Sequence, residues 1–216
     1  LRPLTTNTPK PMLVVGGRPI LETIIRRLAD AGFANFHISV NYHADVIQSH
    51  FGDGTAFGVN VQYIEESEPL GTAGPLGLLP RDLDKPVLVM NADVLTKLDP
   101  SRMIAFHTQN RSIATMGVRE HEVQVPYGVV DLENNRIVGL REKPVERYFI
   151  NAGVYILAPE ARGLIPTGAA YDMPSLFEAC NAADLKTLAF PIRDYWVDIG
   201  RPDDFRRAND EFASIF

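Results

Sequence analysis

The stretch PVLVMNAD, residues 86–93, is a continuous apolar run that ends in a carboxylate. A short run of this kind is typical of a strand that is buried on both faces, as in a parallel sheet covered by helices. The residue that ends the run, Asp93, is therefore expected at the carboxyl edge of a sheet. In open α/β folds, ligands bind beyond that edge.

Helix and strand patterns alternate before this run. A helix pattern at 20–32, a strand pattern at 36–42, a helix pattern at 44–51 and a strand pattern at 59–66 follow one another. In the first of them Ile20, Ile24 and Leu28 share one helical face, and Gly32 is expected to end the helix. This order predicts βαβ crossovers and a mainly parallel sheet with helices on both faces.

After about residue 112 the sequence pattern changes to one typical of strands joined by tight turns. These are SIATMGV at 112–118, YGVVDLENNRIVGLRE at 127–142, with Asn134-Asn135 as a hairpin turn, and FINAGVYIL at 149–157. Helix and strand patterns return from residue 173. We therefore expect one domain over residues 1–216, a Rossmann-like three-layer α/β/α fold with a mainly parallel mixed sheet and a small antiparallel β insertion.

Composition limits the partners and the compartment. The 216 residues carry a formal net charge of -6 and form no long Lys or Arg run, which argues against binding to nucleic acid or to an anionic membrane surface. The single cysteine, Cys180, excludes an internal disulfide and is expected in the core. With no apolar stretch of about 18 residues and no signal peptide, we expect a cytoplasmic protein.

Two carboxylates at strand ends are candidate metal ligands. Asp93 follows the apolar run, and Asp198 in YWVDIG repeats the pattern late in the chain. Mg²⁺ is often held by one or two carboxylates together with substrate phosphates, so this pair suits a metal-phosphate complex. Aspartate also favours helix N-caps and turns, and position alone leaves that interpretation open for Asp93.

Lys10 is bracketed by prolines in TPKPML. Pro9 and Pro11 have fixed φ angles and bias the residues before them toward extended geometry. The pattern predicts a rigid loop that aims one cation.

Three further segments have both a structural and a functional interpretation. The glycines of EPLGTAG at 68–74 allow close backbone approach to a ligand, or form a simple loop-to-helix turn. REKP at 141–144 either belongs to a functional site or forms the solvent-exposed end of a hairpin. In NAGVY at 151–155, Gly153 marks either a close approach to a ligand or structural accommodation.

Taken in order, the motifs resemble those of one family. LRPLT, TPKPML, GGRPIL, EPLGTAG, the apolar run into NAD, YGVV, EKP, INAGVY and YWVDIGRPDDF together resemble the sugar-phosphate nucleotidylyltransferases. The likeness covers essentially the whole chain and is strongest for the branch related to mannose-1-phosphate guanylyltransferases and to bacterial aminosugar and heptose guanylyltransferases.

The resemblance implies transfer of a nucleoside monophosphate, with GTP as the expected donor, to a sugar 1-phosphate such as mannose 1-phosphate. A sugar-phosphate oxygen would attack the α-phosphorus in line, and pyrophosphate would leave. Lys10 would lie against the triphosphate, and Asp93 and Asp198 would hold Mg²⁺ on the phosphates. Relatives often dimerise, so a homodimer is a further expectation.

The resemblance also implies two sets of binding residues. Those expected to contact the nucleotide are Leu4, Thr5, Lys10, Glu66, Leu70, Gly71, Thr72, Ala73 and Asn91. Those expected to contact the sugar phosphate are Tyr127, Gly128, Glu142, Lys143, Asn151 and Gly153. Glu142 would bind sugar hydroxyls and Lys143 the sugar's phosphate, with the insertion lying over the sugar.

The sequence departs from the family pattern in two places. The glycine-rich loop that wraps the triphosphate in the family would come before Leu1, and Arg2 is not the arginine that ends it. Ala92 replaces the usual glycine of the NAD segment, and we expect its methyl group to be harmless.

Three other functions fit parts of the pattern. A catalytically silent nucleotide-sugar sensor would share the fold. A glycosyltransferase would typically carry Asp-x-Asp, where this chain has Asn91-Ala92-Asp93. A cytidylyltransferase or molybdopterin guanylyltransferase is less compatible with EKP and NAGVY.

Overall fold

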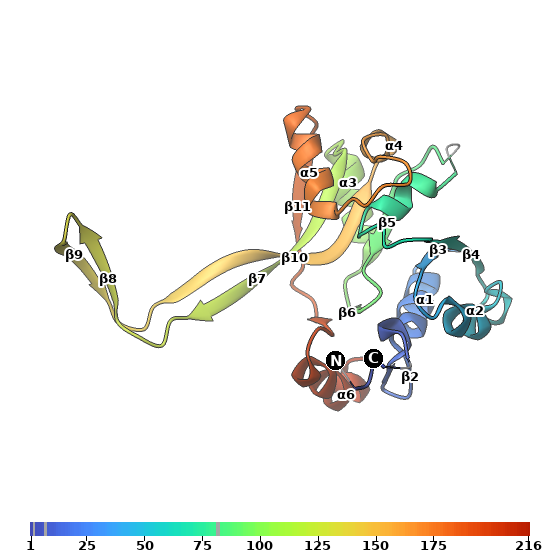
Figure 1. Ribbon diagram of the computed structural model, residues 1–216, viewed down its shortest axis with the longest axis horizontal. Coiled ribbons are helices and arrows are strands. Elements are labelled where there is room, and N and C mark those ends of the chain that lie inside the picture. The colour runs from blue at the N-terminus through green and yellow to red at the C-terminus, as the bar shows by residue number, and fades with distance from the viewer. Residues whose placement is uncertain (2, 7, 81–82) are drawn as a thin grey trace.

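The computed structural model describes residues 1, 3–6, 8–80 and 83–216. Its largest sheet has the order β11 (Thr187–Pro191), β7 (Ala114–Gln124), β10 (Val145–Leu157) and β5 (Val87–Met90) (Figure 1). β7 and β11 are parallel, whereas β10 is antiparallel to both β7 and β5. The α/β class is confirmed, but the sheet is less parallel than the alternation predicted, because the long strand β10 returns between β5 and β7.

Helices cover both faces of this sheet. On one face Tyr155 and Leu157 of β10 pack with Met173 and Leu176 of α5 (Met173–Ala182) and with α4 (Pro159–Arg162). On the other face Val154 and Ile156 of β10 pack with α3 (Pro100–Gln109). Successive side chains of β10 thus pack alternately into the cores on the two faces of the sheet, as a three-layer fold requires. Cys180 is fully buried in the first core, as expected.

The N-terminal region forms a second, smaller unit of sheet. β3 (Asn35–Val40) and β4 (Asn60–Glu65) are a parallel pair, with α1 (Ile20–Asp30), α2 (Ala44–Phe51) and the short helix η2 (Thr55–Phe57) around them. Each of these two helices and two strands matches a segment predicted from the sequence. Gly32, with φ +94°, lies just after α1, in agreement with the predicted helix stop.

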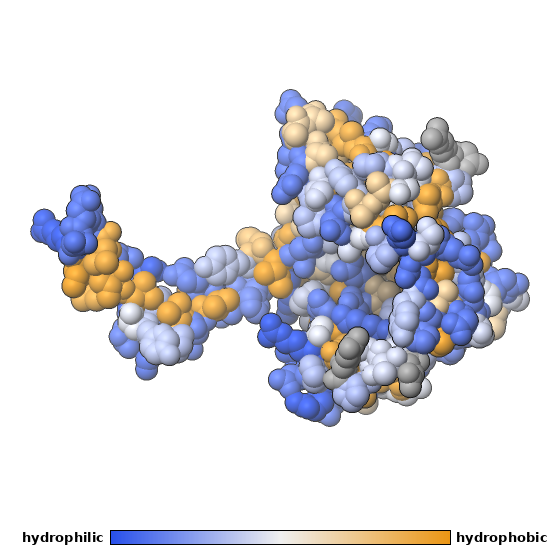
Figure 2. All heavy atoms as spheres, viewed as in Figure 1, coloured by the Kyte–Doolittle hydropathy of each residue, from blue (hydrophilic) through white to orange (hydrophobic). Residues whose placement is uncertain are grey.

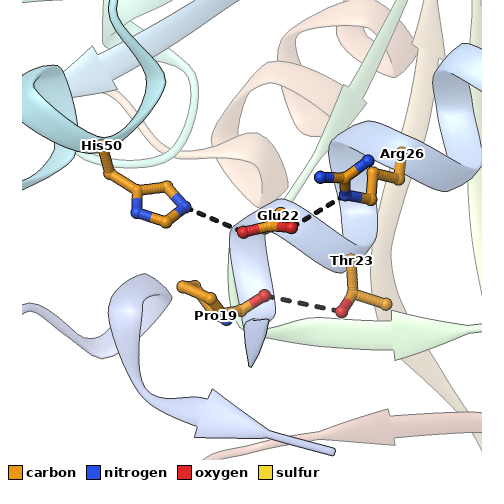
Figure 3. A network of polar contacts seen from close by, with 5 residues as sticks. All are labelled: Pro19, Glu22, Thr23, Arg26 and His50. Carbon is orange, nitrogen blue, oxygen red and sulfur yellow. Dashed lines mark hydrogen bonds and ion pairs between the residues drawn. The ribbon is translucent and has the colours of Figure 1, made fainter. Parts of the chain in front are cut away.

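A polar network joins α1 to α2. Glu22 accepts a hydrogen bond from Arg26 Nε at 2.8 Å and lies 2.8 Å from His50 Nε2 of α2, while the Thr23 hydroxyl donates to the carbonyl of Pro19 (Figure 3). Burial raises the pKa of the Glu22 carboxyl, but the bonds from Arg26 and His50 outweigh it, so the pKa lies below its ordinary value. The network therefore holds a charged carboxylate between the two helices.

Short strands connect the C-terminal region to the rest. β12 (Trp196–Asp198) pairs with β6 (Val94–Thr96), and β1 (Val14–Val15) pairs with β2 (Arg18–Pro19). Trp196 donates a 2.8 Å bond to the carbonyl of Ala152 in β10. α6 (Pro202–Ile215) packs its Ala208 and Phe212 beside these strands. Within the described part of the chain, no helix combines the length and apolar character needed to cross a bilayer.

An arm, residues 119–150, projects from the body (Figure 1). The outer parts of β7 and β10 form a two-stranded ribbon that carries the hairpin of β8 (Val129–Glu133) and β9 (Arg136–Arg141) at its end. Asn134 and Asn135 both have positive φ, which confirms the predicted hairpin turn. The insertion is antiparallel, as expected, but it does not lie over the body, because the ribbon continues outward past the bulge between Asn151 and Tyr155.

Apolar side chains are exposed at the end of the arm. Figure 2 shows this surface, to which Leu132, Ile137, Val138 and Leu140 contribute with exposed fractions of 56–72%. The arm is held mainly by its own ladder and by ion pairs such as Arg147 with Glu122 at 2.9 Å.

His107 provides a test of the packing of α3 on the sheet. It is 2% exposed and its Nδ1 lies 2.8 Å from the hydroxyl of Thr115 in β7. Burial lowers the pKa of the imidazole below its ordinary value. The unfolded chain therefore takes up this proton first as pH falls below about 6.5, so stability is present above that pH and is lost below it.

In the wild type, His107 should lower the unfolding free energy between pH 7 and pH 5 by up to about 1.4 kcal/mol per pH unit. We expect the variant His107→Gln to lack this contribution and so to lose less stability over the same range. Urea denaturation across this pH range measures it. His121→Gln, at an exposed position on the arm, is the matched control and should leave the profile unchanged. Identical profiles for wild type and His107→Gln would contradict the prediction.

Candidate functional site

Lys10 begins the short helix η1 (Lys10–Met12), which connects two cores. Met12 packs in the core around α1 and α2, and Leu13 packs in the core around β6 and β12. Pro9, with φ -62°, precedes the turn and accepts a bond from Met12 at 2.8 Å. Lys10 therefore lies in a 3₁₀ turn and not in the extended geometry expected from the proline that follows it. The rigidity comes from the two buried neighbours as well as from the prolines.

Asp93 and Asp198 are brought together by the pairing of β6 with β12. In that register Asp198 lies opposite Val94, and the amide of Ile199 donates a 3.0 Å bond to the carbonyl of Asp93. The strands are antiparallel, so the end of one lies beside the start of the other. Two carboxylates that are far apart in the sequence thus emerge at one edge.

The Lys10 ammonium contacts both carboxylates. It bonds Asp93 Oδ2 directly and lies 3.8 Å from Asp198 Oδ1. Burial raises the pKa of Asp198 above its ordinary value, and the charge of Asp93 adds to the rise, while Lys10 opposes it. The three charges are therefore coupled, with one cation between two anions.

The donor set is suited to a metal that substrate helps to hold. Among the described residues, no three His, Cys, Asp or Glu side chains gather closely enough to bind a metal ion by themselves. Asp93 and Asp198 supply two hard oxygen donors at one edge, and their side chains remain 23% and 49% exposed. This set fits Mg²⁺ with phosphate oxygens completing the coordination, and does not fit an all-protein cage.

The loop from Glu66 to Gly74 is fixed at both ends. Glu66 accepts a bond from the amide of Leu70 at 2.7 Å and another from the Ser39 hydroxyl at the end of β3. Asp172 accepts bonds from the Thr72 amide at 3.0 Å and the Thr72 hydroxyl at 3.3 Å. The polar groups of Glu66 and Thr72 are thus engaged within the protein, so both act here by positioning the loop.

Backbone bonds complete this loop. The amides of Ala73 and Gly74 both donate to the carbonyl of Tyr171, at 2.8 and 2.9 Å, just before the short helix η3 (Gly74–Leu78). Gly71 has φ +76°, a conformation that disfavours other residues. The glycine is therefore required by the turn, as the structural interpretation of EPLGTAG proposed.

Asn91, Asn151 and Gly153 meet where β5 ends beside β10. The amide of Asn91 donates a 2.8 Å bond to the carbonyl of Gly153, whose own amide bonds the Asn151 side chain at 3.0 Å. Gly153 has φ +69°, and a Cβ there would lie 2.8 Å from the side-chain Nδ2 of Asn91. Close approach of Asn91 thus explains this glycine, and Ala92 packs against the core around α1.

A cleft of about 440 Å³ opens beside these groups. Its polar end is lined by Ser39, Glu66, Gly71, Thr72 and Asn91, and its remaining walls are mostly apolar. Four of the nine predicted nucleotide residues, Glu66, Gly71, Thr72 and Asn91, therefore line one cleft, close to the end of β5 that leads into Asp93.

Leu4 and Thr5 lie apart from these contacts in an N-terminal turn. The amide of Leu4 bonds the carbonyl of Leu1 at 2.9 Å, and the Leu4 side chain is 47% exposed. Arg2 of the LRPLT motif lies outside the described residues.

The remaining sugar-phosphate candidates lie on the arm. Tyr127 and Gly128 precede β8, and Glu142 and Lys143 follow β9, so all four are carried away from Lys10 (Figure 1). A Cβ on Gly128 would lie 3.2 Å from Glu142 Oε2, so the YGVV and EKP motifs do meet each other. The structure thus joins these motifs to one another, but not to the carboxylate edge.

Sequence reasoning missed Ser39 and Asp172. Ser39 alternates with apolar residues in β3 and gives no signal of its bond to Glu66. Asp172 precedes α5 and is typical of an N-cap, yet its side chain makes no cap bond and binds Thr72. Both contacts join segments that are distant in sequence, so no local pattern could indicate them.

Comparison with known proteins identifies relatives over almost the whole chain. Residues 1–214 match the nucleotidyl transferase family. A mannose-1-phosphate guanylyltransferase of Mycobacterium tuberculosis is 34% identical, over 97% of this chain and 60% of its own length. A mannose-1-phosphate guanyltransferase of Pichia angusta is 36% identical, over 95% of this chain and 58% of its own. The chain thus spans about 60% of the length of these curated relatives.

Solved structures share the fold. HddC from Yersinia pseudotuberculosis complexed with GMP-PN superposes with a TM-score of 0.73 at 26% identity, over 98% of this chain and 93% of that chain. A putative glucose-1-phosphate thymidylyltransferase from Bacillus anthracis gives a TM-score of 0.76 at 22% identity, over 97% and 89% of the two chains. The second comparison bears on the fold alone.

We expect Gly71→Ala to lower the unfolding free energy by about 3 kcal/mol, from the left-handed backbone and from the contacts of the new Cβ. That atom would lie 2.6 Å from Asp172 Oδ1 and 2.8 Å from the carbonyl of Tyr171. Gly58→Ala is the matched control, with a similar φ of +71° and open space around it, so it should cost only about 1–2 kcal/mol. Equal losses in thermal or chemical denaturation would show that the loop has room to adjust.

Proposed function

The chain belongs to the nucleotidyl transferase family, and we propose that it transfers a guanylyl group from GTP to a sugar 1-phosphate, releasing pyrophosphate. One observation carries the proposal: Lys10 lies between Asp93 and Asp198 at the end of the sheet. A cation and two carboxylates at one edge can neutralise and orient phosphates, which is the main task in joining two polyanions.

The chemistry needs no covalent intermediate on the protein. An oxygen of the sugar phosphate attacks the α-phosphorus of the nucleotide in line, a new phosphorus–oxygen bond forms, and the bond to the leaving pyrophosphate breaks. Lys10 balances negative charge that develops around the α-phosphorus. Because Lys10 is fixed between two cores, little reorganisation is needed when that charge appears.

Asp93 and Asp198 would hold Mg²⁺. When bound, this ion would neutralise the phosphates and fix their orientation. Burial raises the pKa of Asp198, and the charge of Asp93 raises it further, so a bound cation would relieve the repulsion between the two carboxylates.

The choice of guanine and of a mannose-type phosphate rests on the relatives. The curated relatives are named mannose-1-phosphate guanylyltransferases, and HddC was solved with GMP-PN. In this chain the base and ribose would lie in the polar end of the cleft, against the fixed backbone of Leu70, Gly71, Thr72 and Ala73. Leu4 and Thr5 would border the phosphates.

The sugar phosphate would lie between Asn151 and Gly153 on one side and the arm on the other. Glu142 and Lys143 would reach it only if the arm closes toward the carboxylate edge. Such a movement is open to the ribbon of β7 and β10, because a two-stranded ribbon without a packed face is weakly held.

We expect pyrophosphate release with Mg²⁺ to require both a nucleoside triphosphate and a sugar 1-phosphate, with GTP the best of four triphosphates. Asp93→Asn and Asp198→Asn should each lower turnover at least about 1,000-fold without unfolding the chain, and Lys10→Ala should lower kcat about 100-fold. Asp203→Asn, on the exposed start of α6, is the matched control and should be fully active.

The assay should use the chain with its natural flanking residues, each sugar phosphate being tested alone and with nucleotide. Nucleotide binding without turnover on any sugar 1-phosphate would favour a sensor. Transfer of the sugar from a nucleotide sugar to an acceptor, with the nucleoside diphosphate as leaving group, would instead identify a glycosyltransferase.

The arm gives a separate prediction. Lys143→Met should raise the KM for the sugar 1-phosphate about tenfold or more and leave the KM for GTP unchanged, because a charged hydrogen bond to phosphate is lost. Arg136→Met on the same hairpin is the matched control. If both variants match wild type, the arm does not reach the sugar phosphate.

A further inference from the structure

The hairpin at the end of the arm is amphipathic. Residues that lie opposite each other, and alternate residues of one strand, point to the same side of a ladder. The apolar residues on one side are Val130 opposite Leu140 and Leu132 opposite Ile137. The positions between them carry charged side chains on the other side, where Arg141 lies 3.5 Å from Asp131. The hairpin therefore has one apolar face and one charged face.

The apolar face of the hairpin is uncovered in the single chain (Figure 2). Its four side chains have exposed fractions of 44–72%. A two-stranded hairpin is only marginally stable in water unless a further strand or a helix packs on it. An apolar face that is contiguous and exposed is typical of a surface that binds another macromolecule. We therefore expect this face to be covered by a partner.

The backbone of Lys143, at the base of the hairpin, is strained. Lys143 has φ +43°, a region that lysine rarely adopts. The residue before a proline also favours extended geometry, and Pro144 follows. Strained backbone of this kind occurs often at functional sites. The strain therefore supports a function for Lys143, whose side chain is exposed.

Lys143 lies far from the site of its own copy. β10 pairs with β7 residue by residue from Asn151 out to Val145. At about 3.3 Å per residue this part of the ribbon is about 20 Å long, and Lys143 lies beyond its end. A lysine side chain does not span that separation, so the outward arm presents its cation to another molecule (Figure 1).

The ribbon is held where it would have to bend, at the bulge that follows Asn151. The amide of Asn91 bonds the carbonyl of Gly153 at 2.8 Å. The ring nitrogen of Trp196 bonds the carbonyl of Ala152, also at 2.8 Å. Folding the arm back onto its own body would strain these bonds, whereas a second copy could receive the arm with the bonds intact.

The arm has the size and the charge of one side of an interface between copies. Residues 119–150 number 32, and a standard interface takes about 20–30 residues from each partner. They include five Lys or Arg and six Asp or Glu residues, so the arm carries little of the net charge of -6. Contact between the arm and a second body is therefore not opposed by a large charge on the arm.

We propose that two copies of the chain exchange their arms, so that Lys143 and Glu142 of one copy complete the site beside Asn151 and Gly153 of the other. The apolar face of each hairpin would pack on the body of the partner. In a twofold pair each copy receives what it contributes, so both sites would be complete. The sugar phosphate assigned to this shared site rests on the proposed function.

Cysteine cross-linking tests the exchange without turnover. Lys143→Cys and Asn151→Cys are made in separate chains, co-expressed, and treated with a short bismaleimide; Cys180 is fully buried. We expect the product of doubled mass to be at least about tenfold more abundant than from either variant alone. Arg136→Cys, beside the hairpin turn, replaces Lys143→Cys in the matched control and should give little product. Equal yields from the two pairs, or no product, would overturn the proposal.

Sedimentation shows whether the apolar face holds the pair together. The wild-type chain should sediment as a dimer, and the double variant Leu132→Asp, Leu140→Asp should sediment as a monomer with unchanged helical content. Glu133→Gln, on the charged face, is the matched control and should remain a dimer. A monomeric wild type would overturn the proposal, and so would a double variant that is still dimeric.

Mixed dimers test whether an exchanged arm serves the site of its partner. Asp93→Asn keeps the arm intact, and the double variant Glu142→Ala, Lys143→Met keeps the carboxylate edge intact. Co-expressed, they should regain about a quarter of wild-type turnover at low sugar phosphate, because half of randomly formed dimers are mixed and each has one complete site. Activity no greater than the sum of the two parents would overturn the exchange. An inactive wild type would instead contradict the proposed function, and cross-linking would still decide the exchange.

Discussion

The pairing of β6 with β12 is the constraint on which the site depends. These short strands place Asp198 beside the chain that leaves Asp93, and the bond from the Ile199 amide to the Asp93 carbonyl fixes their register. Two like charges held so closely would repel, and the Lys10 ammonium offsets that repulsion. Because η1 is anchored in two cores, the cation cannot easily move away. The cation and the two carboxylates are thus held together at one edge, as the proposed binding of phosphates requires.

The cleft is organised by contacts between distant segments. Glu66 joins β3 to the start of its loop through Ser39, and Thr72 joins the same loop to the start of α5 through Asp172. These bonds use the side chains of Glu66 and Thr72, which the family resemblance implied as nucleotide contacts. In the proposed function, a nucleotide would contact the backbone that these bonds hold in place. Fixed backbone of this kind recognises a ligand at little entropic cost.

Most elements could be predicted from the sequence, because their patterns are local. The periodicity of residues 20–32 and 44–51 predicted α1 and α2, and Asn134-Asn135 predicted the hairpin turn. The mainly parallel sheet was the weaker prediction, since hydrophobic alternation does not tell which strand lies beside which. β10 lies antiparallel between β5 and β7, and its outward continuation, not its sequence pattern, places Glu142 and Lys143 on a projecting arm.

The sequence by itself determined the residue types and their order: a proline-bracketed lysine, carboxylates at two strand ends and the glycines at tight turns. It also determined the family, because these motifs recur together along the chain. Only the tertiary structure decided that Lys10 meets both carboxylates, that Glu66 and Thr72 are already bonded, and that β3 and β5 face each other across an apolar cleft. The physical reason is that such contacts join segments far apart in the chain, where packing and strand pairing act and local propensity carries no information.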